Sequence, residues 1–133
     1  MGRNKYLIIL GSNTDSRTNL AVAEDGLHRC FGDYVSGEAM LTAPIGMPGS
    51  PAFTNKCIAV VCDRPVDEVK AICKSVEAAT GRRPDDKRHG IVRIDIDLVA
   101  AGDTVLKPDD YRRDYAQGFI PVYEALHADA SDI

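Results

Sequence analysis

Runs of apolar residues, and alternation of apolar with polar residues, divide the chain into four predicted strands. Residues 5–10 and 55–62 are almost continuously apolar, which is typical of buried, central strands. Residues 34–42 alternate more loosely and predict a further strand. Residues 89–99 alternate strictly, which predicts a strand with one face buried and the other face presented.

Apolar residues at helical spacing predict two helices between these strands. Leu20 and Leu27 share the apolar face of the first helix, which ends near a glycine. The second helix opens at Pro65, because proline suits the first turn of a helix. Beyond residue 101 the pattern weakens, and we expect only two short helices, at 108–117 and 119–127.

The resulting order of elements, βαββαβ, predicts an α+β fold of the ferredoxin-like type, in which helices pack on one face of an antiparallel sheet. The 133 residues contain no internal repeat, linker or low-complexity tract. We therefore expect residues 1–133 to form a single domain. Because this fold hosts many unrelated functions, the function has to be argued from particular residues.

Charge and composition narrow the class of partner. The formal net charge is −4, and the predicted strand 55–62 has no aromatic pair, so nucleic acid is not expected as a partner. The apolar run near the N-terminus is too short for a signal peptide or a membrane span. We expect a cytoplasmic protein that acts on small molecules without membrane contact.

The presented face of the strand 89–99 carries Arg93, Asp95 and Asp97 in line. Neighbours on one face of a strand lie roughly 6.5–7 Å apart, so the two carboxylates repel each other. A solvated outer face of an edge strand is the simpler interpretation. Divalent cations also resolve the repulsion, since Mg²⁺ binds carboxylate and phosphate oxygens and paired ions sit about 3.5–4 Å apart. Asp95 and Asp97 are therefore candidate ligands for two Mg²⁺ ions.

Two neighbouring segments strengthen the interpretation as a nucleotide site. The stretch 81–90 is rich in Arg and Lys, which suits a polyphosphate, although solubility explains it equally well. Phe53 and Asn55 lie at the end of the proline-rich loop 43–53 and just after it. The Phe53 ring could stack on a flat heterocycle, and the Asn55 amide could bond to its edge. A plain surface loop is the alternative. No P-loop or Rossmann motif occurs in the chain.

Five motifs together resemble the 6-hydroxymethyl-7,8-dihydropterin pyrophosphokinase family of folate biosynthesis. They are GSN at 11–13, T-x-P-x-G…P-x-F-x-N at 42–55, E…GR at 77–82, R-x-G at 88–90 and D-x-D at 95–97. The resemblance runs from about residue 7 to residue 99. It implies a ferredoxin-like enzyme that transfers diphosphate from ATP to the pterin hydroxymethyl group and releases AMP, with two Mg²⁺ ions.

The resemblance also implies a role for individual residues. The expected pterin-binding residues are Gly11, Thr42, Pro44, Phe53, Asn55, His89 and Phe119. The expected nucleotide-binding residues are Glu77, Arg83, Leu98, Arg112, Arg113 and Tyr115. The expected catalytic residues are Arg82, Arg88 and Arg93, and the expected metal ligands are Asp95 and Asp97.

The chain departs from the family pattern at several positions. His89 occupies the place of a tryptophan, and Arg93 is shifted by one position along the strand. Near the C-terminus an aspartate replaces a histidine, and Gln117 replaces an arginine. Two other functions stay open: a non-catalytic module that binds pterin or nucleotide, and a phosphotransferase acting on another small alcohol.

Overall fold

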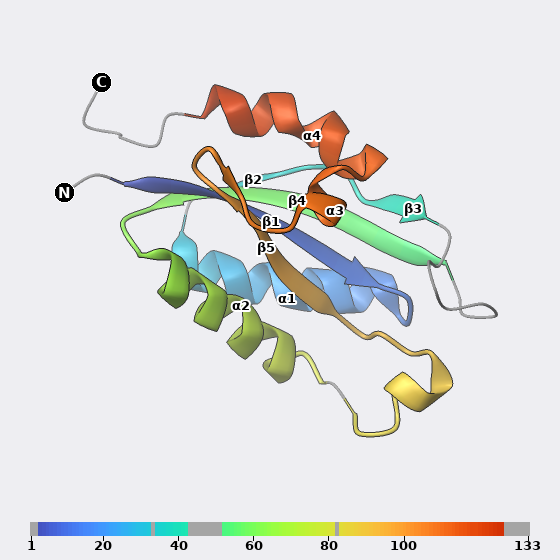
Figure 1. The fold of residues 1–133 in the computed structure, drawn as a ribbon. Coiled ribbons are helices and arrows are strands. Elements are labelled where there is room, and N and C mark those ends of the chain that lie inside the picture. Colours follow the sequence, from blue (N-terminus) through green and yellow to red (C-terminus); the bar gives the residue numbers. More distant parts are fainter. Residues whose placement is uncertain (1–2, 33, 43–51, 82, 127–133) are drawn as a thin grey trace.

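The computed structural model describes residues 3–32, 34–42, 52–81 and 83–126 (Figure 1). The strands are β1 (Asn4–Ser12), β2 (Tyr34–Ser36), β3 (Met40–Thr42), β4 (Phe53–Cys62), β5 (Asp95–Ala101) and β6 (Thr104–Val105). The helices are α1 (Ser16–Phe31), α2 (Val66–Ala79), α3 (Pro108–Tyr111), α4 (Asp114–Ala125) and the 3₁₀ helix η1 (Lys87–His89). None of the helices described is long and apolar enough to cross a bilayer.

The strands form one antiparallel sheet in the order β2-β4-β1-β5-β6, and β3 also pairs with β4. The sequence order places β1 first, but the sheet places it in the centre. There it pairs along its whole length with β4 and along six residues with β5. With helices packed on the sheet, this arrangement confirms the predicted α+β ferredoxin-like fold.

Helices cover both faces of the sheet, whereas we expected helices on one face (Figure 1). Tyr6 and Ile8 of β1 point toward α1 and α2, and Leu7 and Ile9 point to the other side. There they meet α4, whose Phe119 is buried against them. The continuous apolar pattern of β1 follows from this arrangement, because a strand covered on both faces has no position that faces water.

The predicted strand 34–42 is broken into β2 and β3. Gly37 lies at the break, where its backbone N–H donates to the carbonyl of Cys57 at 2.9 Å. A Cβ atom at Gly37 would lie 2.9 Å from Cδ1 of Phe119, so the backbone touches α4 at this point. Close packing of α4 thus explains why the strand is interrupted at a residue without a side chain.

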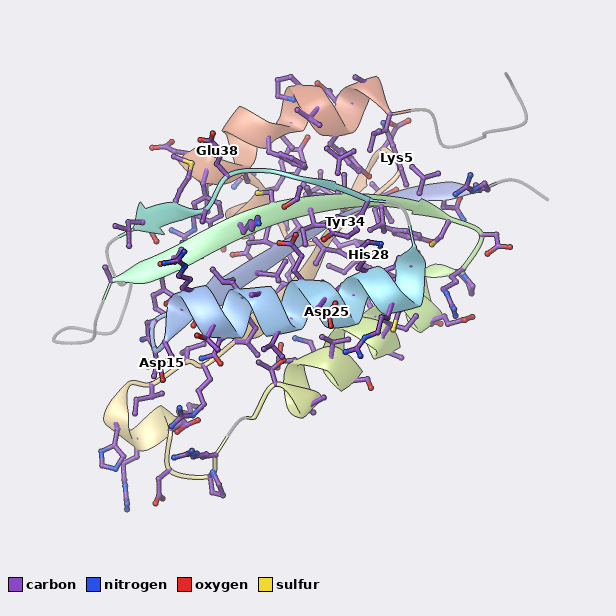
Figure 2. All side chains as sticks on the ribbon, turned by 180° about the vertical axis from the view of Figure 1, so that it is seen from behind. Lys5, Asp15, Asp25, His28, Tyr34 and Glu38 are labelled. Atoms are coloured by element: carbon purple, nitrogen blue, oxygen red, sulfur yellow. The ribbon has the colours of Figure 1, made fainter. Side chains whose placement is uncertain are left out.

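Tyr34 of β2 contacts α1 with both its hydroxyl and its ring. The hydroxyl of Tyr34 donates to Oε2 of Glu24 at 2.7 Å, and its ring contacts His28 edge-on, with ring centroids 5.1 Å apart. Figure 2 shows Tyr34 reaching from the strand toward His28 on the helix. This contact fixes the edge of the sheet relative to the helices beneath it.

The predicted strand 89–99 begins only at Asp95, because the preceding segment is held by Asn13 instead of by a neighbouring strand. The backbone N–H of Asn13 donates to the carbonyl of Val92 at 2.9 Å. Its side-chain amide donates to the carbonyl of Gly90 at 2.8 Å and accepts from the Val92 N–H at 2.7 Å. The expectation that Arg93 shares a strand face with the two aspartates was therefore wrong.

Replacing Asn13 by alanine should lower the free energy of unfolding by about 2–4 kcal/mol. Asn13 is buried, and the change leaves the half-buried carbonyl of Gly90 and the half-buried N–H of Val92 without their side-chain partner; an unsatisfied group costs about 1–3 kcal/mol when it is fully buried. Urea unfolding followed by circular dichroism measures the loss, with exposed Thr18→Ala as the control. Equal stability of the Asn13 and Thr18 variants would contradict the role of Asn13 in holding the segment before β5.

Candidate functional site

The register of three strands brings functional side chains into one row across the sheet. Gly11 of β1 pairs with Asp95 of β5 on one side and with Asn55 of β4 on the other. Residues directly opposite each other in an antiparallel pair point to the same face. Asp95 and Asn55 therefore stand on either side of a backbone without a side chain, on the face that carries α4.

A pocket of about 640 Å³, here called the sheet pocket, opens over this row. It is lined mainly by Gly11, Met40, Leu41, Thr42, Phe53, Asn55, Asp95, Asp97, Asp110, Arg113 and Tyr115. The Asn55 amide donates to Oγ1 of Thr42 at 2.6 Å, which fixes its orientation. A Cβ atom at Gly11 would approach Oδ1 of Asn55 to 3.0 Å, so glycine leaves the floor open. Two aromatic rings, of Phe53 and Tyr115, and a fixed amide suit a flat, polar heterocycle.

A second pocket of about 1040 Å³, here called the loop pocket, lies between α2, the 83–93 segment and the start of β5. Its walls include four cationic residues, Lys74, Arg83, Lys87 and Arg93, and also Glu77, Asp86 and Asp95. The four cationic side chains suit phosphate groups, although the three carboxylates leave a net charge of only +1 on the lining. Asp95 lines both pockets, so the two cavities meet at this carboxylate, while Asp97 lines the sheet pocket alone.

Asp97 is neutralised by two lysines. Nζ of Lys107 donates to Oδ1 of Asp97 at 2.6 Å, and Nζ of Lys74 reaches the same oxygen at 3.4 Å. Burial opposes the charge of Asp97, but the hydrogen bond and charge of Lys107, together with the charge of Lys74, outweigh it and hold its pKa below the ordinary value.

Asp95 has weaker support, since the charge of Lys74 favours its ionised form but does not outweigh the opposing effects. Burial, followed by the negative charges of Asp97 and Glu77, raises the pKa of Asp95 to about 6. The pair therefore ionises fully only above that pH in the protein alone. A divalent cation would remove this repulsion, and two carboxylates provide the hard oxygen donors that Mg²⁺ takes.

Among the residues that the structure describes, no group of three or more His, Cys, Asp or Glu side chains is placed to hold a metal ion. Asp95 and Asp97 are a pair of donors rather than a closed site. An ion bound to them would take its remaining ligands from water or from phosphate, as Mg²⁺ commonly does. The residues present thus fit a metal that arrives with a phosphorylated substrate.

Glu77 fixes the position of the carboxylate pair. Its buried Oε2 accepts from the backbone N–H of Ile96 at 2.8 Å and from Lys74 at 3.0 Å. Ile96 lies between the two aspartates, in the part of β5 that the short strand β6 does not reach. The glutamate carboxylate takes the place of a neighbouring strand there, and so it holds the edge of the sheet under the site.

Two arginines of the loop pocket are anchored to Asp86. Arg93 donates to both carboxylate oxygens of Asp86, from Nε at 2.9 Å and from Nη2 at 3.2 Å. The backbone N–H of Arg83 donates to Oδ2 of the same residue at 2.8 Å. That N–H, followed by Arg93, holds the pKa of Asp86 below its ordinary value. Asp86 therefore keeps the Arg93 guanidinium at the wall of the pocket.

The structure does not bring all of the predicted residues to these pockets. Arg88 pairs with Asp85 at 3.4 Å on the surface, and His89 is exposed beside it. Arg112 lines a separate shallow hollow by α3. Phe119 is buried and faces a smaller cavity of about 310 Å³, which adjoins the sheet pocket at its Met40, Asn55 and Tyr115. The side chain of Leu98 lies in the core beneath α1 and α2. Pro44 and Arg82 lie outside the residues described.

Lys74 and Lys107 were missed from the sequence. Lys74 stands three residues before Glu77 on a predicted helix, a spacing that favours contact between the two side chains. That spacing was a usable signal. No such signal marked Lys107 in the sequence, because its contact with Asp97 depends on the turn that folds the chain back after β5.

Comparison with models of known protein families identifies the family of this chain. The model of the 7,8-dihydro-6-hydroxymethylpterin-pyrophosphokinase (HPPK) family matches residues 7–126. The chain belongs to the HPPK family. Members of this family transfer diphosphate from ATP to hydroxymethyldihydropterin in folate synthesis. The match extends past the D-x-D motif to the end of α4, which includes the segment where the chain departs most from the expected pattern.

No curated protein matches this HPPK family member. Among solved structures, Bacillus subtilis YxeP, a dinuclear metal-binding peptidase of the M20 family, shares 10% identity at a TM-score of 0.34, over 73% of this chain and 25% of that chain. The B. subtilis GlnK–ATP complex shares 12% identity at a TM-score of 0.33, over 73% of this chain and 84% of that chain. This chain spans about a quarter of the peptidase, and such low TM-scores support no shared function.

In metal-free buffer, Asp95→Asn should stabilise the protein above pH 6 and change little near pH 4. A raised native pKa means that ionising Asp95 destabilises the folded state; the cost is absent below the ordinary value of 3.8 and complete above about 6. At about 1.4 kcal/mol per pKa unit, the gain should be about 1–3 kcal/mol.

Urea unfolding at pH 4 and pH 7.5, with a chelator present, measures this difference. Asp63→Asn, in the exposed turn after β4, serves as the control. A gain of the same size at both pH values would show that Asp95 does not carry the predicted cost.

Proposed function

We propose that this chain is an active pyrophosphokinase that transfers diphosphate from ATP to the hydroxymethyl oxygen of 6-hydroxymethyl-7,8-dihydropterin and releases AMP. One observation carries the proposal: a pocket suited to a flat heterocycle and a pocket lined by cations meet at Asp95. Transfer between two substrates needs both reacting groups at one point, and the meeting of the pockets provides it.

The sheet pocket takes the pterin. The Phe53 ring stacks on the bicyclic heterocycle, and the amide of Asn55, oriented by Thr42, bonds to its polar edge. Gly11 leaves the floor free so that the ring can lie against the backbone of β1. The hydroxymethyl group then points along the row toward Asp95.

The loop pocket takes the triphosphate. Lys74, Arg83, Lys87 and Arg93 line it and oppose the phosphate charge. Arg113, the residue before α4, lines the sheet pocket together with Asp95 and Asp97 and is a further candidate for phosphate binding. Asp95 and Asp97 would hold Mg²⁺. When bound, the ions neutralise and orient the phosphate oxygens.

The reaction forms one bond and breaks one. The pterin hydroxymethyl oxygen attacks the β-phosphorus, and the bond from that phosphorus to the oxygen bridging the α- and β-phosphates breaks. AMP leaves with the bridging oxygen, and the hydroxyl proton passes to solvent. The chain contributes chiefly by positioning and by electrostatic stabilisation, as is general for phosphoryl transfer.

Roles for the other predicted residues follow from which of them line the pockets and which lie next to a lining residue in the sequence. We propose Arg93 as the arginine beside the transferred group, because it already lines the loop pocket. Arg82 and Arg88 flank that pocket in sequence and are kept as phosphate-binding candidates. Tyr115 lines the sheet pocket, so we assign it to substrate contact there. His89 and Arg112 receive no role.

Product analysis tests the proposal. The purified protein is incubated with ATP, Mg²⁺ and 6-hydroxymethyl-7,8-dihydropterin, and nucleotides and pterins are separated by chromatography. We expect AMP and pterin diphosphate in equal amounts, and at least a hundredfold lower rate for Asp97→Asn, since loss of one electrostatic contact costs about 10²–10³ in rate. ADP as the product would contradict the proposal. Pterin binding without AMP would favour a non-catalytic module.

Phe53→Ala should weaken pterin binding about tenfold and leave ATP binding unchanged. The substitution removes one of the two aromatic rings that line the sheet pocket and leaves Tyr115, and stacking contributes about 1 kcal/mol beyond the buried area. Calorimetric titration with each substrate separates the two effects, with Val105→Ala on β6 as the control. Equal losses for pterin and ATP, or no loss of pterin affinity, would remove Phe53 from the pterin site.

A further inference from the structure

Two lysines contact Asp97, but they are held in different ways. Nζ of Lys74 contacts three oxygens: Oε2 of Glu77 at 3.0 Å, the carbonyl of Ile96 at 3.0 Å and Oδ1 of Asp97 at 3.4 Å. The first two contacts remain if Asp97 binds something else. Lys74 is therefore built into the wall of the site independently of Asp97.

Lys107 depends on Asp97. Among the residues described, Asp97 is its one ion-pair partner, with Nζ 2.6 Å from Oδ1. The backbone of Lys107 is fixed, because its N–H donates to the carbonyl of Val99 at 3.2 Å, next to the bond from Leu106 to the same carbonyl at 2.8 Å. Its side chain is 45% exposed, so it has room to turn while the backbone stays in place.

Lys107 occupies Oδ1 of Asp97, one of the two carboxylate oxygens that this residue can offer to a metal ion. An ammonium group and a divalent cation compete for a carboxylate oxygen, and once separated from it they repel each other. The released ammonium then lies beside the phosphates that the ion binds, and phosphate oxygens are strong acceptors for it. The contact seen in the structure, with Lys107 on Asp97, thus suits the protein without its charged substrate, and a Lys107 turned toward phosphate would suit the protein with it.

From this geometry we propose that Lys107 is a phosphate-binding residue that is held on Asp97 until the metal-bound nucleotide arrives. Lys107 releases the carboxylate and donates to a phosphate oxygen instead. This inference rests on the proposed function of the site. It assigns to the turn between β6 and α3 a direct part in binding the nucleotide. Lys107 competes with a metal ion that arrives alone, but it strengthens binding of a metal ion that arrives with a nucleotide.

Calorimetric titration at pH 8 tests the proposal with two ligands: Mn²⁺ alone, and α,β-methylene-ATP with saturating Mg²⁺. In Lys107→Met, Mn²⁺ should bind several-fold more tightly, because its competitor is gone. The nucleotide should bind about tenfold more weakly, because a charge-assisted hydrogen bond is lost. Changes in opposite directions are the expected signature. Lys70→Met, an exposed lysine of α2, is the matched control.

Lys107→Arg should restore nucleotide binding, since it keeps the positive charge and the donors. Thermal unfolding verifies that each variant is folded. Weakening of both ligands together would make Lys107 a support of Asp97 rather than its competitor, and no change in either would make it a surface ion pair; both results overturn the inference. If the wild-type protein binds no nucleotide, the proposed function fails. If the wild-type protein binds nucleotide but the Lys107 variant does not show the opposite changes, only this inference fails.

Discussion

The pairing of β1 with its two neighbours determines where the functional side chains lie. Gly11 sits opposite Asp95 on one side and Asn55 on the other. The candidate metal ligand and the candidate heterocycle-binding amide therefore lie on the two strands that flank β1. A shift of one residue in either register would turn one of them to the face of α1 and α2. The apolar residues of β1, buried on both faces, fix that register, so the core and the site depend on the same pairing.

The site itself is a balance of charges around Asp95 and Asp97. Without substrate, lysines stabilise Asp97, and Asp95 carries the cost of burial near other carboxylates. Such an arrangement is less stable than an apolar one, but it favours a ligand that brings positive charge to the carboxylates and negative charge to the lysines. A nucleotide with its magnesium ions brings both. The same closely spaced carboxylates thus raise the energy of the protein alone and favour the binding of the proposed substrate.

Local pattern predicted those parts of the fold that depend on neighbouring residues. The periodicity around Leu20 and Leu27 predicted α1, and the alternation around Asp95 placed both carboxylates on one face of a strand. Long-range contacts decided the rest. Nothing near Arg93 shows that Asn13 holds the preceding residues away from a strand. Likewise the short apolar pattern of α4 does not show which face of the sheet it covers, so its consequences for Phe119 could not be predicted.

A crystal structure with Mg²⁺, α,β-methylene-ATP and 6-hydroxymethyl-7,8-dihydropterin would test the central claim most directly. The claim is that two pockets take two different substrates and meet at Asp95. The account predicts electron density for the pterin between Phe53 and Asn55, for the triphosphate beside Arg83 and Arg93, and for ions on Asp95 and Asp97. A pterin bound outside the sheet pocket, or phosphates that do not reach Asp95, would contradict it.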